Sequence, residues 1–512
     1  MLPQLTNLRV EDGIKHVVIL GAGPAGLTAA YELTHHAIPV TVLEKDSRYV
    51  GGIARTVEYQ GNRIDIGGHR FFSKSREIEA LWTEILGDEM LVRRRLSHVF
   101  FRGHYFTYPL DVSDLLMKLG SVEILRCIIS YIWAHIHPIE NPQTYEDWVV
   151  NEFGERLFQI LFKPYTEKVW GMSTKISADW APQRIRRLNL KRAMISVLPF
   201  VQRVDGRLTK TLVDHFRYPR LGPGQMWERL RAILEERGQR VMLGQEVISL
   251  QHDGTRISSV LVQNEQGAVQ EIQGTHFIST LPIRELVEMC NPPLPLTVQK
   301  AAKGLKYRDF LTVALLIDKE KMFPDNWIYL PDPKVRAGRI QNFKNWSPAM
   351  VADSEKTCLG LEYFCLREDA LWMMPDEDLL ALAQRELIAL GMCQREEILG
   401  GIAVRQPKAY PVYDEMYREH VAVVRKYVEE QLVNLQLVGR NGMHHYDNQD
   451  HAMMTALLAA RNIARGLKLD PWKVNTDGEY HEEVQLKDKQ FSDQLVPQRV
   501  ERAKLYFRQE SW

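Results

Sequence analysis

Three glycines near the N-terminus have a spacing that suits a nucleotide phosphate. Gly21, Gly23 and Gly26 follow a short apolar run, Val17–Leu20, in a GxGxxG pattern. Gly21 allows a tight turn, Gly23 lets backbone N–H groups approach a pyrophosphate, and Gly26 lets a helix pack closely on a strand. The N-terminus of that helix would face the phosphate charge, because its first N–H groups have no acceptor within the helix. The pattern therefore predicts a dinucleotide site.

A carboxylate completes this pattern. The second β-branched run, Val40–Leu43, leads into Glu44, about 20 residues after the glycines, where an acid accepts hydrogen bonds from ribose hydroxyls. A GxGxxG motif alone is weak evidence, and the alternative is a glycine-rich turn without a ligand. Two strands, the helix Leu27–Leu33 and the acid in register favour the site. We therefore also count Ala25 and Lys45 among its contacts.

A second glycine turn points to FAD rather than NAD. The sequence GGIAR begins at Gly51 and DIGGH begins at Asp65, as in flavoproteins that resemble the amine oxidase and glutathione reductase superfamily. The glycines leave room for backbone beside a bulky ligand, and Arg55 offers a cation to its pyrophosphate. The alternative is an ordinary turn. The expected FAD contacts here and on a later strand are Gly52, Ile53, Ala54, Gly68, His69 and Val247.

A third motif with possible flavin chemistry lies near the C-terminus. An Ala-, Leu- and Met-rich run after Asp450 should be helical, with Asn448–Asp450 as its cap region. A helix whose positive end faces an isoalloxazine ring would stabilise negative charge on reduced flavin. The alternative is a capped helix of the core. The expected contacts of this motif are Gly439, Arg440, Asn448, Gln449 and Asp450.

Composition and charge limit the class of protein. The 512 residues exceed what one hydrophobic core usually holds, so two or three domains are expected. Lys plus Arg and Asp plus Glu both number 65, so the global charge does not indicate nucleic acid. Five scattered cysteines without a CxxC pair fit a reducing compartment better than a disulfide framework. No metal-binding spacing stands out.

The sequence also bears on membrane association. No basic-then-apolar signal segment opens the chain. The most apolar stretch, Ile124–Ile136, is too short to span a bilayer and contains Arg126. We expect a buried helix there, with membrane contact as the alternative. These features predict a soluble, cytoplasmic protein without a transmembrane segment.

The order of helical and strand patterns predicts an α/β fold with a discontinuous Rossmann-type FAD-binding domain. The pieces of this domain are residues 1–75, 203–285 and 432–470. Residues 76–202 should form a mainly helical domain, residues 286–431 a mixed or antiparallel β-sheet domain for the substrate, and residues 471–512 a peripheral tail. A ligand would bind where these domains meet.

Local patterns specify elements within these domains. Helices are expected at Glu77–Ile85, Trp148–Phe162 and Asp376–Leu390. Strands or extended segments are expected at Val99–Tyr108, Val241–Leu250, Phe277–Thr280, Leu311–Ile317 and Leu359–Cys365.

Several arginines and tyrosines stand beside prolines and aromatic residues. Arg184 follows Trp-Ala-Pro-Gln, Arg339 precedes a segment that ends in Ser-Pro, and Tyr410 lies in Lys-Ala-Tyr-Pro. Tyr446 shares the C-terminal motif with Arg440. Each of these residues taken singly is best explained as a surface or structural residue, so any common role depends on the pattern of the whole chain.

Eight segments over roughly residues 15–465 resemble, in order, those of the UDP-galactopyranose mutases, particularly the longer eukaryotic type. The segments are GAGPAGLTAAYEL, DIGGHRFFS, YFTYPL, PYTEKVWGMSTKISADWAPQRI, YPRLGPGQMW, RIQNFKNWSP, KAYPVYD and GRNGMHHYDNQDHAMMTALLAARNI. The resemblance implies an FAD domain of the amine oxidase and protoporphyrinogen oxidase-like superfamily, and a nucleotide-diphosphate sugar as substrate. It further implies that FAD acts in its reduced form, usually reduced by NAD(P)H. In that reaction the N5 atom of the reduced flavin would attack the anomeric carbon of the sugar, and the pyranose and furanose forms of the sugar would interconvert.

The resemblance also implies roles for single positions. Arg184 and Arg339 match the arginines that clamp the diphosphate, and Tyr410 and Tyr446 match the tyrosines that hydrogen-bond its oxygens. His69 matches the histidine whose loop lies beside flavin N5, and with the four clamp residues it forms the candidate catalytic set. The implied substrate-binding residues are Phe72, Tyr108, Trp170 and Asn448.

Two positions depart from the family pattern. The family usually has a glutamine three residues after the tyrosine of a YPF-like segment and an asparagine before KVW, and both approach the uracil. Here these positions hold Asp111 and Thr166. An amide donates and accepts hydrogen bonds whereas a carboxylate only accepts, so base recognition should differ. The resemblance thus supports a nucleotide-sugar mutase-like enzyme without specifying the base or the sugar.

Two other classes remain open. An FAD oxidoreductase, such as an amine oxidase, a protoporphyrinogen oxidase-like enzyme or a desaturase, shares the glycine motifs and the closing helix. The set Arg184, Arg339, Tyr410 and Tyr446 favours the mutase, because an oxidase of apolar amines or porphyrins does not need it. The other class is a flavin-binding protein without turnover. No second Rossmann repeat is visible, so a nicotinamide reductant would dock transiently in the substrate cleft.

Overall fold

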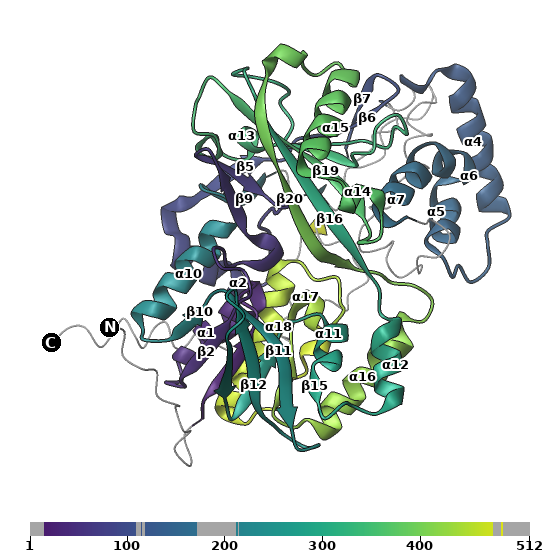
Figure 1. The fold of residues 1–512 in the computed structure, drawn as a ribbon. Coiled ribbons are helices and arrows are strands. Elements are labelled where there is room, and N and C mark those ends of the chain that lie inside the picture. Colours follow the sequence, from purple (N-terminus) through teal and green to yellow (C-terminus); the bar gives the residue numbers. More distant parts are fainter. Residues whose placement is uncertain are drawn as a thin grey trace.

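Two large sheets organise the chain (Figure 1). The computed structural model describes residues 15–108, 114, 118–171, 211–212, 215–474 and 483–484. A sheet with packed helices forms the lower half in Figure 1, a longer twisted sheet forms the upper half, and a group of helices flanks the upper sheet. This architecture confirms the α/β fold class predicted from the sequence. Most of the predicted tail, residues 471–512, lies outside the described residues.

A five-stranded parallel sheet forms the Rossmann-type half. Its order is β10 (Arg240–Met242), β2 (Val40–Leu43), β1 (Val17–Leu20), β14 (His276–Ser279) and β21 (Leu435–Leu437). All neighbouring pairs are parallel. Strand β1 is fully buried, as a strand covered on both faces must be. Three separate parts of the chain therefore meet in one sheet, as the discontinuous pattern requires.

Strand β1 contributes to two hydrophobic cores, because successive side chains point to opposite faces. Val17 and Ile19 belong to the core under the helices, and Val18 and Leu20 belong to the core on the other face. The first core contains α1 (Pro24–Thr34), α18 (Gln449–Arg465), α10 (Gly224–Glu236) and α2 (Arg76–Leu86). The second contains β11 (Gln245–His252), β12 (Ile257–Asn264), β13 (Val269–Gln273), β15 (Cys290–Asn291), α11 (Ile283–Glu288), α12 (Leu296–Gly304) and α16 (Tyr417–Gln431).

A seven-stranded sheet forms the other half. Its order is β20 (Ile398–Pro411), β16 (Tyr307–Ile317), β19 (Thr357–Cys365), β18 (Arg339–Asn342), β17 (Trp327–Tyr329), β6 (Ser97–Phe101) and β7 (His104–Thr107). Its pairs are antiparallel except β17 with β6. Helix α15 (Asp376–Ala389) packs on one face, and β16 and β20 run down towards the Rossmann-type half (Figure 1).

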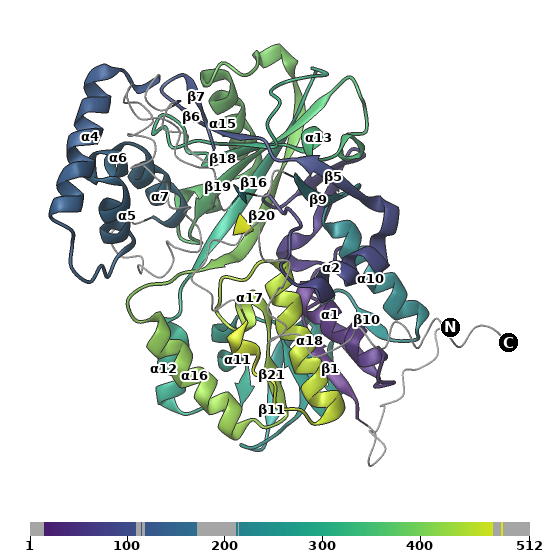
Figure 2. The same cartoon turned by 180° about the vertical axis from the view of Figure 1, so that it is seen from behind.

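A helical unit flanks this sheet (Figure 2). It consists of α4 (Ser121–Ile136), α5 (Tyr145–Phe153), α6 (Glu155–Leu157), a π-helix at Phe158–Phe162 and α7 (Lys163–Trp170). The helix predicted over Trp148–Phe162 is therefore interrupted at Gly154. There φ is +83° and a Cβ would lie 2.7 Å from the backbone nitrogen of Tyr131, so only glycine fits.

The remaining elements are short. They are β3 (Thr56–Tyr59), β4 (Asn62–Asp65), β5 (Met90–Arg94), β8 (Thr211–Leu212), β9 (His215–Pro219), β22 (Glu483–Val484), α13 (Phe343–Trp346), α14 (Ala370–Met373), α17 (Gly439–Gly442) and five 3-10 turns.

Three sequence expectations differ from the structure. Residues 90–94, in the segment expected to be mainly helical, form the strand β5, whereas the extended segment expected over Val99–Tyr108 is found in β6 and β7 of the large sheet. The strand expected over Val241–Leu250 is two strands in different sheets, because Gly244 turns the chain with a φ of +64°. Ile124–Ile136 is helical as expected, but it is not buried, since its apolar side chains face outwards.

Candidate functional site

A cavity of about 510 Å³ lies where the carboxyl ends of β1 and β2 meet the large sheet. Ligands of open parallel sheets bind beyond the carboxyl ends of their strands, so its position is that of a nucleotide site. Most positions singled out from the sequence line this cavity. They are Gly21, Gly23, Ala25, Glu44, Lys45, Gly52, Ile53, Gly68, His69, Phe72, Tyr108, Val247, Arg339, Tyr410, Gly439, Arg440, Tyr446, Asn448, Gln449 and Asp450.

Four candidate positions do not appear in the lining. Gly26 and Ala54 are buried behind the wall and serve packing. Trp170 is buried against the side chains that line the cavity. Arg184 lies outside the described residues, as does Asp111.

The first glycine turn has the close contacts that its motif requires. Gly21 has a φ of +101°, and a Cβ there would lie 2.2 Å from Oγ1 of Thr280. A Cβ on Gly26 would lie 1.9 Å from the carbonyl oxygen of Gly21. Gly23 differs, because a Cβ there would meet nothing nearer than the Cα of Gly52 at 3.9 Å. The absent side chain of Gly23 therefore leaves space between two glycine turns at the cavity wall.

Glu44 is held at the end of β2 by backbone donors. Its Oε2 accepts a hydrogen bond from the N–H of Ala22 at 2.8 Å, and its Oε1 accepts one from the N–H of Asp46 at 3.0 Å. Burial raises the pKa of this carboxyl group. Each oxygen keeps a second acceptor position. The geometry suits a carboxylate that receives ribose hydroxyls at the cavity wall.

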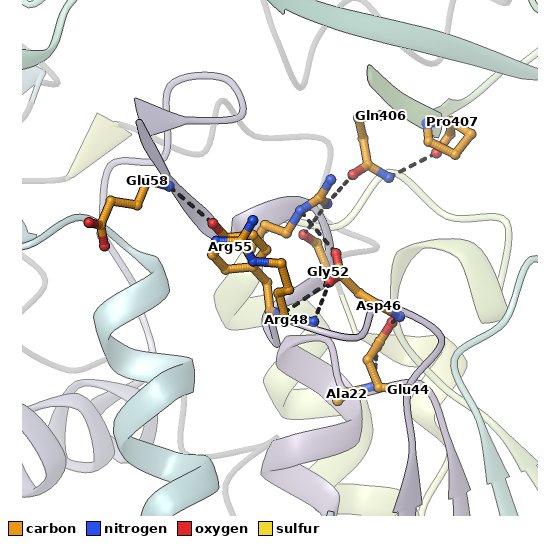
Figure 3. A network of polar contacts seen from close by, with 10 residues as sticks. Ala22, Glu44, Asp46, Arg48, Gly52, Arg55, Glu58, Gln406 and Pro407 are labelled. Atoms are coloured by element: carbon orange, nitrogen blue, oxygen red, sulfur yellow. Dashed lines mark hydrogen bonds and ion pairs between the residues drawn. The ribbon is translucent and has the colours of Figure 1, made fainter. Parts of the chain in front are cut away.

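Arg55 does not line the cavity, contrary to its expected role as a cation for the pyrophosphate. Its Nη1 donates to the carbonyl oxygen of Gly52 at 2.9 Å and to Oε1 of Gln406, and its Nε lies 3.7 Å from a carboxylate oxygen of Asp46 (Figure 3). Gln406 belongs to β20 of the large sheet. Arg55 thus joins the second glycine turn to the large sheet.

Replacing Arg55 with methionine should loosen this connection. The variant loses two hydrogen bonds of a charged donor, each worth about 1.5–3 kcal/mol. We expect a lower Tm and faster FAD release, measured by thermal unfolding and by flavin fluorescence on dilution. Arg48→Met, at an exposed neighbouring position, is the matched control and should behave as the wild type. Equal FAD release rates for the Arg55 and Arg48 variants would refute the connecting role.

The C-terminal motif, Gly439–Asp450, forms another part of the cavity wall, beside the two glycine turns. Asn448 precedes α18 and forms a capping box with His451, which confirms the expected cap region. The side chain of Gln449 accepts a hydrogen bond at 3.2 Å from Nε1 of Trp227, a fully buried residue of α10. A Cβ on Gly439 would lie 2.9 Å from that of Ala25, so this turn packs directly on α1. The N-terminus of α18 therefore borders the cavity.

His69 lies on the same wall with a defined tautomer. Its Nε2 lies 2.8 Å from the carbonyl oxygen of Ile66, which can only accept, so Nε2 carries the proton. Burial lowers the pKa of His69 to about 4. The imidazole is therefore neutral at physiological pH, and its Nδ1 is an acceptor.

The pKa of His69 predicts a pH dependence of stability. An unfolded histidine has a pKa near 6.5, so between pH 6.5 and about 4 the unfolded chain binds more protons and stability falls as the pH falls. The difference corresponds to roughly 3 kcal/mol. Asp65 acts in the opposite direction, because burial raises its pKa to about 7. We therefore expect His69→Asn to lose less Tm than the wild type between pH 7 and 4.5. His104→Asn, on exposed β7, should follow the wild type, and parallel curves for all three proteins would contradict the neutral imidazole.

Tyr410 and Tyr446 form an aromatic cluster in the wall of the cavity. Their rings stack with centroids 5.6 Å apart, and Trp170 contacts both, at 5.9 and 6.3 Å. The guanidinium of Arg440 lies 4.7 Å from the Tyr446 ring centroid and 5.5 Å from that of Tyr410. Three distant segments of the chain therefore converge as the sequence pattern anticipates.

Arg339 is oriented by a buried carboxylate. Its Nε pairs with Oε2 of Glu362, which is fully buried on the neighbouring strand β19, and Oε1 of Glu362 accepts from Nε2 of Gln341 at 2.6 Å. Burial disfavours the charged guanidinium, but Glu362 and the nearby tyrosines together outweigh this effect and hold the pKa of Arg339 well above its usual range. A charged guanidinium is thus held in the wall of the cavity, which Arg339 lines.

Further residues of the cavity were not identified from the sequence. Arg70 lies 4.4 Å from the Trp327 ring centroid, and Arg95 lies 5.7 Å from that of Tyr108. Tyr329 contacts Tyr108, with centroids 4.6 Å apart, and also borders the cavity. Arg70 directly follows His69 in a recognised segment and could have been found there. Arg95 and Tyr329 are placed by sheet pairing, for which the sequence has no local signal.

The bottom of β20 also contributes to the wall. Lys408 has a φ of +52°, pairs with Glu285 of α11, and its carbonyl oxygen accepts from Nδ2 of Asn441 at 3.0 Å. Burial lowers the pKa of Lys408 to about 8, with Lys45 nearby adding to the effect. Lys408 therefore connects the large sheet to the part of the cavity wall where Lys45 lies.

Known proteins with similar sequences and structures include both mutases and oxidoreductases. The chain is 25% identical over 162 residues to a probable UDP-galactopyranose mutase of Klebsiella pneumoniae, which covers 31% of this chain and 41% of that protein. It is 29% identical over 113 residues to a 1-hydroxycarotenoid 3,4-desaturase of a Flavobacterium species, covering 21% and 23%. These matches thus span less than half of each relative.

The fold is similar to that of a crystal structure of reduced UDP-galactopyranose mutase. The TM-score is 0.77 at 21% identity, over 91% of this chain and 99% of that one. The sequence model of the family described as flavin containing amine oxidoreductase matches residues 24–463. FAD is the cofactor that this family implies, and the glycine walls, Glu44 and the α18 N-terminus fit it. This chain belongs to the flavin containing amine oxidoreductase family.

Proposed function

We propose that this enzyme is an FAD-dependent nucleotide-sugar mutase that interconverts pyranose and furanose forms of a sugar. The observation that carries the proposal is the wall of arginines and tyrosines beside the His69 loop. Arg70, Arg95, Arg339 and Arg440 line one end of the cavity together with Tyr108, Tyr165, Tyr329, Tyr410 and Tyr446. An apolar amine or a polyene offers no negative charge to these cations, whereas the diphosphate of a nucleotide sugar does.

The arginines would hold the diphosphate in place. A guanidinium fork matches phosphate oxygens, and such contacts are stronger than neutral hydrogen bonds. The pairing of Arg339 with Glu362 fixes the direction of the guanidinium before substrate arrives. The same contacts would stabilise the charge that develops on the diphosphate as it leaves the sugar.

The tyrosines, the FAD and His69 would have separate roles in the proposed reaction. Tyr410 and Tyr446 have hydroxyl groups for phosphate oxygens, and their stacked rings exclude water from the reacting centre. FAD, when bound and reduced, supplies the nucleophile for the anomeric carbon, so the chain needs to hold the sugar over it. His69, neutral and fixed by Ile66, would accept a hydrogen bond beside the ring. NAD(P)H would serve as the external reductant.

The base of the nucleotide is left open in this proposal. Thr166, at a position where the family has an asparagine that approaches uracil, is buried beside Tyr145 and is not part of the cavity lining. The sequence similarity to a probable UDP-galactopyranose mutase supports the reaction class. We therefore propose a nucleotide-diphosphate sugar as substrate without naming the base.

Turnover under reducing conditions tests the proposal. The dithionite-reduced protein is incubated without oxygen with UDP-, GDP- and dTDP-hexopyranoses, and furanose forms are separated by chromatography and identified by NMR. We expect conversion of one nucleotide sugar by the reduced protein and none by the oxidised protein. A flavin whose mass increases by that of the sugar after cyanoborohydride treatment would support the same conclusion. No conversion of any nucleotide sugar would refute it.

An FAD oxidoreductase is the second candidate, because the family as a whole and the similarity to a desaturase favour it. An oxidation catalysed by such an enzyme requires that the reduced flavin passes electrons to oxygen or another acceptor. Rapid reoxidation in air, together with oxidation of an amine or desaturation of a polyene, would establish it. A reduced flavin that reoxidises slowly and converts a nucleotide sugar would exclude it.

A further inference from the structure

Helix α4 presents an apolar face to the outside of the molecule. Six large apolar side chains on this one helix are between 48% and 66% exposed. They are Val122, Leu125, Ile129, Ile132, Trp133 and Ile136. Figure 2 shows α4 at the outer edge of the helical unit, on the side away from the large sheet. We call these six residues the α4 stripe.

The spacing of the stripe shows that it is one continuous face. Its residues recur at intervals of three and four, so they follow one side of a helix about 24 Å long. The opposite side holds the helix on the protein, since Tyr131 and Ala134 are buried and Glu123 pairs with Arg156 at the start of α6. The usual pattern of a surface helix is therefore reversed, with apolar residues outside.

Such a face is costly in water. Burying one large apolar side chain contributes roughly 1.5–3 kcal/mol, and single exposed apolar residues are common whereas contiguous patches mark interaction sites. The stripe is not covered by any described element. No helix in the described part of the chain is long and apolar enough to cross a membrane.

The charges around the stripe select between its possible partners. Arg126 is the one charged residue among the exposed residues of this face, and its side chain is 62% exposed. It lies 3.8 Å from Glu123, whose other oxygen already pairs with Arg156. A second copy of the stripe would bring a second Arg126, while the Glu123 carboxylate of each copy is already paired with Arg126 and Arg156. A phospholipid offers phosphate to the guanidinium and acyl chains to the stripe.

A shallow groove supports the same partner. It has a volume of about 470 Å³ and runs beside Ile129 and Trp133 between Arg126 and Arg156, with Ser130, Glu155 and Gln159 also in its lining. Aromatic side chains with one polar end favour the boundary between headgroups and acyl chains. Arg126 and Arg156 border the space next to Trp133, although Glu155 reduces the net charge there.

We propose that the α4 stripe docks on a phospholipid surface, with the helix lying in the plane of the membrane and the stripe at the boundary between headgroups and acyl chains. The contact would hold the protein at a membrane without crossing it. Because Arg126 and Arg156 both pair with Glu123, and Glu155 lies beside them, anionic lipid should strengthen the binding only a few-fold. A mutase and an oxidoreductase could both use such a contact, so the proposed function is not required for it.

Vesicle binding of the full chain with its FAD tests this proposal. The protein is sedimented with vesicles of phosphatidylcholine alone and with added phosphatidylglycerol. We expect binding to both, a blue shift of tryptophan fluorescence, and at least a tenfold loss of binding in the double variant Ile129→Glu/Trp133→Glu. Leu296→Glu, at a position 70% exposed on α12, is the matched control and should bind as the wild type. Retained FAD absorbance shows that each variant is folded.

Three outcomes would overturn the proposal. The wild type fails to bind either type of vesicle, or the double variant binds as well as the Leu296 control. In the third outcome, the wild type runs as a dimer on sizing, the double variant runs as a monomer, and neither binds vesicles, which would assign the stripe to self-association.

Discussion

Replacing Arg339 with alanine should weaken the binding of a nucleoside diphosphate by roughly ten- to a hundredfold while FAD stays bound. The estimate follows from one charge-assisted contact to phosphate, worth about 1.5–3 kcal/mol. Arg339 lines the cavity at its substrate end, and its guanidinium is directed there by Glu362. Calorimetric titration of the FAD-loaded protein with nucleoside diphosphates measures the effect.

The alanine variant has a second consequence that must be separated from binding. Removing Arg339 leaves Glu362 buried without its partner, which costs about 3–5 kcal/mol of stability. The double variant Arg339→Met/Glu362→Met removes both charges and should be close to the wild type in Tm, yet it should bind nucleotides as weakly as the alanine variant. Arg217→Ala removes a surface pair with Glu79 and should not affect binding. Normal nucleotide affinity in the methionine double variant would contradict the role of Arg339.

Valine at position 23 should abolish FAD retention without unfolding the protein. Gly23 has a φ of −75°, which valine tolerates, and its Cβ would project into the space between the two glycine turns. Valine fills the volume where a pyrophosphate approaches the N-terminus of α1. We expect the purified variant to lose essentially all bound FAD, so that it lacks the flavin absorbance near 450 nm. Its far-ultraviolet circular dichroism should match that of the wild type.

Gly23→Ala is the graded control for this prediction. One methyl group at 3.9 Å from the Cα of Gly52 fits the empty site, so alanine should weaken FAD retention less than valine does. A yellow and active valine variant would mean that the pyrophosphate lies elsewhere.

The Rossmann-type half could be predicted because its signals are local. The strands Val17–Leu20 and Val40–Leu43 agree with the structure at both ends, since a short β-branched run between turns has few alternatives. The closing α18 helix and its Asn448 cap were found for the same reason. The convergence of Tyr410 and Tyr446 was anticipated only through the order of eight segments along the chain, because no local pattern links residues 36 positions apart.

Residues whose roles depend on distant contacts were misjudged. Arg55 carries a cation next to a glycine turn, which suits a pyrophosphate, yet Gln406 and Asp46 occupy its guanidinium. Trp170 was expected in the pocket, and it contacts both tyrosines although the cavity lining does not include it. Lys408 begins the recognised segment KAYPVYD but was given no role, because its place at the cavity depends on its pairing with Glu285 of α11.

Helix α4 shows a different limit of prediction from the sequence, which concerns the direction of an apolar face. An apolar stretch such as Ile124–Ile136 at most predicts a helix with an apolar face, and the natural inference is that the core covers that face. Sequence periodicity gives the width of the stripe but not the direction in which it points. The direction is set by contacts of the opposite side, where Glu123 pairs with Arg156 and Tyr131 is buried.

The central claim is that a nucleotide diphosphate binds over the flavin between the arginines and tyrosines of the cavity. The most direct test is to reduce the protein with dithionite in the absence of oxygen and to follow the flavin absorbance during titration with UDP, GDP and dTDP, free and as their sugars. The account predicts a saturable spectral change with one of these bases, which is lost in the Arg339→Met/Glu362→Met variant. No spectral response of the reduced wild type to any of the six ligands would contradict it.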